Sequence, residues 1–181
     1  MPRKRWLVPE AQIDALLNAS VLRVEEPVRW TSQGLWRKAE LSVLGAPQGM
    51  SLILNLSISV RLRGKYSYQL RLDSGQVWRR LDVRGGHRNR MSVCGADEVW
   101  SARTHKHRYS DTAADSCAYT PADITAGTVT SPGVIQSTDD AGEYERTFGE
   151  FLNECGIAFV GQWRDALEEP SAIPMRLGEV S

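Results

Sequence analysis

A run of strictly alternating apolar and polar residues in the first half of the chain constrains the fold most. From position 51 to 63, leucine, isoleucine and valine occupy every second position, and the same alternation returns at 66–73 after Gly64-Lys65. Successive side chains of a β-strand point to opposite faces, so this period of two predicts strands with one buried and one polar face. A tight turn at 73–75 then leads into a third such segment, 76–83. The region predicts an antiparallel meander of at least three strands.

Further elements are predicted on both sides of this meander. Segment 10–19 carries apolar residues at helical spacing, and segment 21–45 predicts two strands. A glycine-rich turn at 84–87 is expected to close the meander, and 98–110 predicts another strand. Segment 139–157 predicts the main helix, with Asp139 or Asp140 as its N-terminal cap and Gly156 beyond its end.

These elements predict an α+β protein with an antiparallel sheet of about five to six strands. An N-terminal helix precedes the sheet, and the C-terminal amphipathic helix packs on one face of it. We expect one domain over 1–163 and a loosely held tail over 164–181. The polar stretch 110–140 predicts a long surface connection with one short helix near 121–126.

Charge is unevenly distributed along a chain whose formal net charge is zero. Residues 61–108 carry 12 basic and 4 acidic side chains, and residues 109–181 carry 3 basic and 13 acidic ones. A basic middle segment favours an anionic partner, and RNA more than DNA is expected here. The alternative interpretation is that the acidic end folds back and neutralises the basic sheet.

The cysteines and the apolar segments bear on the compartment. Cys94, Cys117 and Cys155 are few, odd in number and widely spaced, which predicts incidental thiols in a reducing cytosol rather than a disulfide framework or a zinc ribbon. The first ten residues lack the apolar run of a signal peptide, and the longest apolar region is much shorter than the roughly 20 residues of a membrane span. A cytoplasmic protein without membrane contact is expected.

All the histidines of the chain lie between positions 82 and 109, and these predict the candidate site. His105 and His107 share one strand face roughly 6.6 Å apart, a spacing that suits a phosphodiester between them. Imidazole exchanges protons near neutral pH, and cations stabilise charge that develops on phosphorus. We predict His87, His105, His107 and Asp82 as catalytic residues of a cofactor-free site. The predicted nucleic-acid-binding residues are Arg84, Arg88, Arg90, Arg103, Lys106, Arg108 and Tyr109.

Two other interpretations of the histidines stay open. A strand that reads His-Lys-His-Arg is also typical of a solvated sheet edge, where charge prevents unwanted pairing. A His-x-His pair with His87 and Asp82 also fits a transition metal, although the surrounding arginines disfavour a bound cation. The prediction is therefore a site without a metal.

The pattern of the middle of the chain resembles a known group of sequences. LRLDSGQVWRRLDVRGGHRNR, followed by THKHRY and by a helix ending in FLNECGI, resembles an uncharacterised family of small prokaryotic and phage proteins. It is more distantly similar to TumE-type toxins of toxin–antitoxin systems. The resemblance covers about 66–157 and implies a toxin that acts on RNA or translation. It also implies that Asp82, the three histidines and Tyr109 correspond to the functional residues of the family.

Three function hypotheses follow. The leading one is a toxin-like effector that cleaves RNA without a metal. The alternative is a non-enzymatic phage or mobile-element protein that binds a nucleic acid, an antitoxin or another protein partner, with an anti-defence or regulatory role. The third is a homo-oligomer in which the acidic helix docks on the basic sheet of a neighbour.

Overall fold

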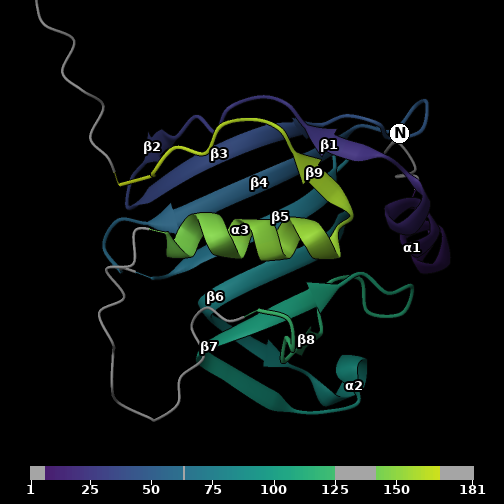
Figure 1. Ribbon diagram of the computed structural model, residues 1–181. Helices are drawn as coiled ribbons and strands as arrows, with labels where there is room; N and C mark the ends of the chain where they lie inside the picture. Colours follow the sequence, from purple (N-terminus) through teal and green to yellow (C-terminus); the bar gives the residue numbers. More distant parts are fainter. Residues whose placement is uncertain (1–6, 63, 125–141, 168–181) are drawn as a thin grey trace, which may run out of the picture.

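The predicted alternation forms the centre of a seven-stranded antiparallel sheet, one or two strands more than expected. The computed structural model describes residues 7–62, 64–124 and 142–167. Neighbours in the sheet are also neighbours in the sequence, so the sheet is a meander (Figure 1). Its strands are β2 (Thr31–Gln33), β3 (Trp36–Val43), β4 (Leu52–Ser59), β5 (Tyr66–Leu72), β6 (Val77–Asn89), β7 (Glu98–Arg108) and β8 (Ala118–Tyr119).

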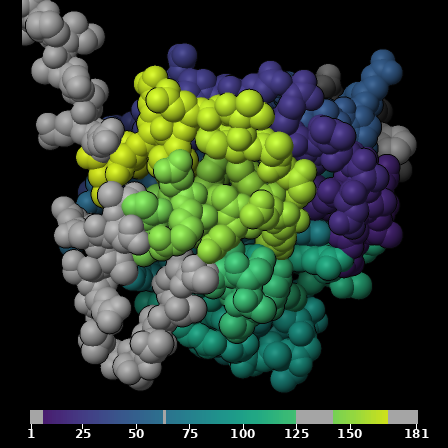
Figure 2. Space-filling model, viewed as in Figure 1, coloured from purple at the N-terminus to yellow at the C-terminus, as the bar shows by residue number. Residues whose placement is uncertain are grey.

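The predicted main helix, α3 (Glu143–Glu154), crosses one face of the sheet (Figure 1). The ring of Tyr68 on β5 contacts the rings of Phe148 and Phe151 at centroid distances of 5.5 and 6.2 Å. The buried Tyr68 hydroxyl donates to the carbonyl oxygen of Tyr144 over 2.8 Å, so this hydroxyl is satisfied beneath the helix. Figure 2 shows the helix and the segment after it as an outer layer over the middle of the sheet. The α+β fold with the C-terminal helix on one sheet face is confirmed.

Segments from the two opposite parts of the described chain pair beside this layer. Helix α1 (Glu10–Ala19) is confirmed, and it leads into β1 (Leu22–Val24), which pairs in parallel with β9 (Ile157–Phe159). Segment 21–45 thus forms three strands where two were predicted, because the second half of it folds into the hairpin β2–β3. The packed chain extends at least to Ala166, which is 2% exposed, and the rest of the predicted tail from 168 lies outside the described residues.

Strand β6 corrects the predicted turn at 84–87. The strand continues through these residues to Asn89, and the chain turns instead at α2 (Met91–Cys94). Two positions of the predicted short helix, 125 and 126, lie outside the described residues, and its first four are not helical. Both predicted helix caps, Asp139 and Asp140, also lie outside them. Among the helices of the described chain, none has the length and apolar character to cross a membrane.

The cysteine prediction is wrong for two of the three thiols. Cys94 at the end of α2 and Cys117 just before β8 form a disulfide with a Cα–Cα distance of 5.5 Å. Cys155 is free and buried, as expected. A spacing of 23 residues gave no sign of the pairing, because the hairpin β6–β7 folds the two cysteines together only in three dimensions.

Candidate functional site

The three histidines converge on the face of the sheet that is turned away from α3. Their ring centroids lie 4.7 Å apart for His87 and His107, 5.1 Å for His105 and His107, and 5.9 Å for His87 and His105. In the ladder, Asp82 lies opposite His105, and Arg80 lies opposite His107. We call these five residues the histidine cluster.

A bulge in both strands brings His87 into the cluster. Positions 82 and 87 of a regular strand would face opposite sides, because they are five positions apart, an odd number. The register between β6 and β7 shifts on both sides of Gly85, where Arg84 and Ala102 adopt left-handed φ angles of 50°. Such an irregularity re-aims the residues beyond it. His87 therefore lies on the same side of the sheet as Asp82.

Two of the three histidines are fully buried. His105 and His107 are each 0% exposed, whereas His87 is half-buried and borders a hollow of about 550 Å³. The spacing of His105 and His107 had predicted a phosphodiester between them. Because both rings are buried, they do not flank one in this conformation. The accessible imidazole of the cluster is that of His87.

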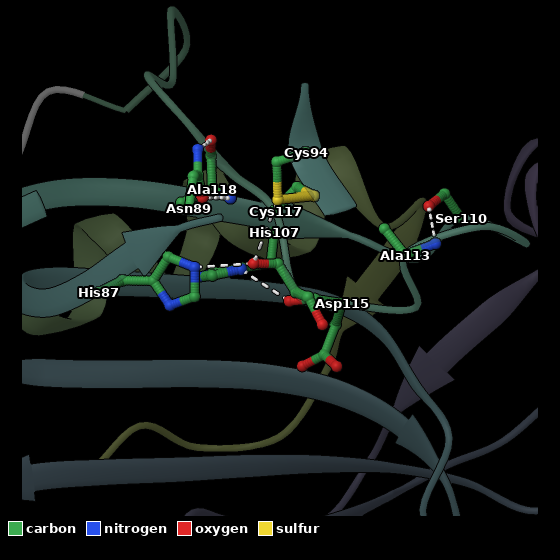
Figure 3. The surroundings of a disulfide bond; sticks show 10 residues. His87, Asn89, Cys94, His107, Ser110, Ala113, Asp115, Cys117 and Ala118 are labelled. Carbon is green, nitrogen blue, oxygen red and sulfur yellow. Dashed lines mark hydrogen bonds between the residues drawn. A yellow bond between two sulfur atoms is a disulfide. The ribbon is translucent and has the colours of Figure 1, made fainter. Parts of the chain in front are cut away.

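The segment before Cys117 covers the cluster and fixes two ring orientations. Figure 3 shows His87 and His107 bonded to main-chain oxygens beside the disulfide. Nε2 of His87 lies 2.7 Å from the carbonyl oxygen of Ser116, and Nδ1 of His107 lies 2.8 Å from that of Asp115. A carbonyl only accepts, so each of these nitrogens carries a proton and donates it. In the neutral ring, Nδ1 of His87 is then the basic nitrogen.

Arg80 connects the buried part of the cluster to the hollow. It donates through Nη2 to Nε2 of His107 over 2.8 Å, through Nε to Asp82 over 3.0 Å and through Nη1 to Asp115 over 3.1 Å. Guanidinium does not accept, so Nε2 of His107 is unprotonated and this ring is neutral. Burial, together with the charge of Arg80, lowers the pKa of His107.

Asp82 is the negative charge of the cluster. Its carboxylate oxygen lies 3.3 Å from Nε2 of His105 and 3.5 Å from Nε2 of His107. Burial alone would raise the pKa of Asp82. Interactions with the two histidines and with Arg80 outweigh burial and hold this pKa well below its usual range, so the group is a carboxylate at neutral pH.

The predicted nucleic-acid-binding residues separate into three groups. Arg88 and Arg90 line the hollow around His87, together with Arg80. Arg84, at the bulge, is half-buried, and Arg103 lies over the ring of Trp100 at 4.4 Å rather than in the hollow. The third group, which points away from the cluster, consists of Lys106, Arg108 and Tyr109.

Within this third group, Lys106 is neutralised by the acidic end of the chain, as the alternative interpretation proposed. Lys106 is 2% exposed and its Nζ lies 2.6 Å from carboxylate oxygens of both Asp123 and Glu154. Arg108 pairs with Asp14 and Glu10 of α1. Tyr109 is buried in the core. These three side chains are not available to a nucleic acid in this conformation.

Sequence reasoning missed four residues of the site. The alternation in 76–83 places Arg80 on the same strand face as Asp82, and this could have identified Arg80 as a residue of the site. Asp115 and Ser116 act from an irregular segment that carried no signal. Asn89 clamps β8, because its side-chain amide donates to the carbonyl of Ala118 over 2.8 Å and accepts from its N–H over 2.7 Å.

The polar face of the sheet leads up to the cluster in two cross-strand rows. In one row Lys38, Ser57, Ser67 and Asp82 are successive ladder partners, and Asp82 pairs with His105. The second row consists of Glu40, Asn55, Gln69, Arg80 and His107. Several of these residues also line a second hollow of about 580 Å³.

Fold and site together define an α+β protein with two buried histidines and a half-buried aspartate beside an arginine-lined hollow. The chain belongs to a family of unknown function, DUF6978, whose model matches residues 9–157. No curated protein and no solved structure matches the chain with significance. The resemblance to TumE-type toxins stays a prediction.

Proposed function

We propose that the protein acts on RNA and cleaves its phosphodiester backbone at the hollow beside His87, as a metal-independent, toxin-like ribonuclease. The observation that carries the proposal is the position of His87. It is the accessible imidazole of the cluster, its Nε2–H is fixed on Ser116, and Arg80, Arg88 and Arg90 surround it.

In this proposal Nδ1 of His87 acts as the general base. It takes the proton of a 2′-hydroxyl, the 2′-oxygen forms a bond to phosphorus, and the bond from phosphorus to the 5′-oxygen breaks. The leaving oxygen takes its proton from water. The arginines hold the phosphate and stabilise the charge that develops on it. The buried His107 and Asp82 keep Arg80 in place.

The products of RNA incubation test the proposal. The untagged protein, in a chelator, is expected to cleave a single-stranded RNA to products that end in a 2′,3′-cyclic phosphate. It should leave the same strand intact when the 2′-hydroxyls are replaced by hydrogen. His87→Ala should lower the rate by about 10²–10⁴, the usual contribution of a general base.

Matched arginine variants complete the test. Arg90→Ala should weaken RNA binding, whereas alanine at the exposed Arg164, which does not line the hollow, should leave binding and cleavage unchanged. Equal cleavage by the native chain and by His87→Ala would remove the proposal, since a contaminating nuclease would then be the source.

A second candidate is a non-enzymatic protein that binds nucleic acid or a protein partner, such as an antitoxin. The burial of His105 and His107 favours it, because it leaves a single accessible imidazole. This candidate predicts RNA binding that falls steeply with salt, weakens with Arg88→Ala or Arg90→Ala, and is insensitive to His87→Ala. RNA that stays intact while it is bound would decide for it.

A cytoplasmic setting is part of the proposal. It requires that the Cys94–Cys117 bond be reversible, since disulfides are rare in a reducing cytosol.

A further inference from the structure

The proposed reaction does not use the buried nitrogen of His105, which lies beside the Asp82 carboxylate without a hydrogen-bond partner among the described residues. Nδ1 of His105 lies 2.9 Å from the carbonyl oxygen of Arg103 and donates to it. Nε2 of the same ring is fully buried and has no hydrogen-bond partner among the described residues, although the Asp82 carboxylate lies 3.3 Å away. A bare nitrogen and a carboxylate oxygen at this distance repel each other. A cation, either a proton or a metal, is needed between them.

His107 is prepared in the same way. Main-chain carbonyls hold the Nδ1–H groups of both rings, so Nε2 is the nitrogen of each ring that lies near the Asp82 carboxylate. This is how proteins usually orient histidines that bind a metal through Nε2. Ligand atoms of Asp82, His105 and His107 all lie within 4.8 Å of one another.

Two of the three ligand separations suit a small transition-metal ion. Ligands about 2.1 Å from a tetrahedral zinc ion lie about 3.4 Å from one another. The carboxylate oxygen of Asp82 lies 3.3 and 3.5 Å from the two Nε2 atoms. Two imidazoles and one carboxylate also form the donor set that Zn²⁺, Co²⁺ and Ni²⁺ accept readily.

Arg80 occupies part of this position. Its guanidinium contacts both Asp82 and Nε2 of His107, and thus stands in for a cation at two of the three ligands, while Nε2 of His105 remains without a partner. The Arg80 side chain is 24% exposed, so it has a route toward the hollow. From the sequence, crowding by arginines had argued against a metal. In the structure, Arg88 and Arg90 lie in the hollow, and Arg80 is the arginine that bonds to His107.

We propose that Asp82, His105 and His107 form a binding site for a divalent transition-metal ion, and that Arg80 competes with the ion for this site. The bound ion replaces the guanidinium at His107 and Asp82 and satisfies the buried nitrogen of His105. Because the metal-binding test contains no RNA, its outcome is independent of the proposed ribonuclease activity.

Titration of the untagged protein with Co²⁺ tests the site, since tetrahedral Co²⁺ bound to nitrogen and oxygen ligands absorbs visible light. Zn²⁺ should then displace Co²⁺ and remove the absorption. Asp82→Asn and His105→Gln should each weaken binding by more than the roughly 10–100-fold effect of losing an outer-sphere partner. Arg164→Ala is the control, because this exposed residue lies outside the cluster, and it should bind Co²⁺ like the native chain.

Arg80→Met gives the sharpest result. It removes a positive charge from within roughly 4 Å of the ion and should tighten Co²⁺ binding by at least about tenfold. If Arg80 instead supported the site, its removal would weaken Co²⁺ binding. This variant also decides the matter where Asp82→Asn or His105→Gln fails to fold by circular dichroism. No absorption in either the native chain or Arg80→Met overturns the proposal, as does equal binding by folded Asp82→Asn and the native chain.

Discussion

A β-carbon at Gly85 would lie 3.0 Å from Cε1 of His105 and 2.8 Å from Cβ of Asp82. The absence of a side chain at this position is therefore what allows the two residues to face each other across β6 and β7. A methyl group at this position would crowd both residues without changing any charge in the cluster.

Gly85→Ala is expected to lower the free energy of unfolding by about 1–3 kcal/mol, the usual cost of an extra methyl group in a tightly packed place. Urea denaturation measures the change. The matched control is Gly86→Ala, because a β-carbon there meets only the carbonyl oxygen of Trp100, at 3.9 Å. If both variants lose the same free energy of unfolding, the cost comes from the strand conformation and not from crowding of the cluster.

The lowered pKa of His107 predicts a loss of stability on mild acidification. Below about pH 6.5 the unfolded chain protonates this histidine while the folded chain does not, so the folded state is disfavoured as the pH falls. The slope has an upper bound of about 1.4 kcal/mol per pH unit for one proton. His107→Gln should remove this part of the slope between pH 6.5 and 5, measured by urea denaturation, whereas His87→Gln should keep it. Slopes that coincide for His107→Gln and the native chain would contradict the assignment.

Asp82 acts in a separate pH range. Its folded pKa is held below its usual range, so its stabilising contribution is present above about pH 3.9, the unfolded value, and is lost as the pH falls further. The two residues can therefore be distinguished in one titration.

The buried amine of Lys106 predicts a large effect from a residue outside the cluster. Lys106→Ala leaves Glu154 with the more distant Arg79, 3.9 Å away, and should cost about 3–5 kcal/mol, as expected when one member of a buried ion pair is removed. Replacing both charges, with Lys106→Met and Glu154→Gln together, should restore part of this loss. Arg88→Met, in an exposed pair with Asp97, is the control and should change the thermal midpoint little.

The disulfide predicts that a reductant acts on the cover of the cluster. The double variant Cys94→Ser, Cys117→Ser should be about 3 kcal/mol less stable, because the bond closes a loop with a separation of 23 residues. Dithiothreitol should lower the unfolding temperature of the native chain to that of the double variant and leave the variant unchanged. A native chain whose unfolding temperature does not respond to full reduction would contradict a stabilising role.

Alternation made the sheet predictable, and the bulge limited what could be predicted of the site. The strands in 51–83 and the apolar face of α3 could be predicted because their patterns of apolar residues are local, repeating within a few positions of the sequence. At Arg84 and Ala102 the backbone leaves the regular conformation, and a period of two no longer tells on which face a side chain lies. Arg103, predicted to bind nucleic acid, lies over the ring of Trp100.

Burial and long-range pairing set the other limit. The turn predicted at 84–87 is absent, and the bulge at Gly85 instead brings His87 to the other two histidines. Their burial depends on Asp115 and Ser116, which reach the cluster from an irregular segment that Cys117 anchors. A contact of this kind has no periodic signature, and an odd number of cysteines argued against the bond that holds it.

The parallel pair β1–β9 has a consequence for the order of biosynthesis. Leu22 meets Ile157, so this contact waits until nearly all of the described chain has left the ribosome, whereas every strand of the meander emerges next to its partner. We expect the histidines to be assembled on a nascent sheet whose apolar face still lacks α3. In that interval the exposed face depends on chaperones or on rapid completion of translation.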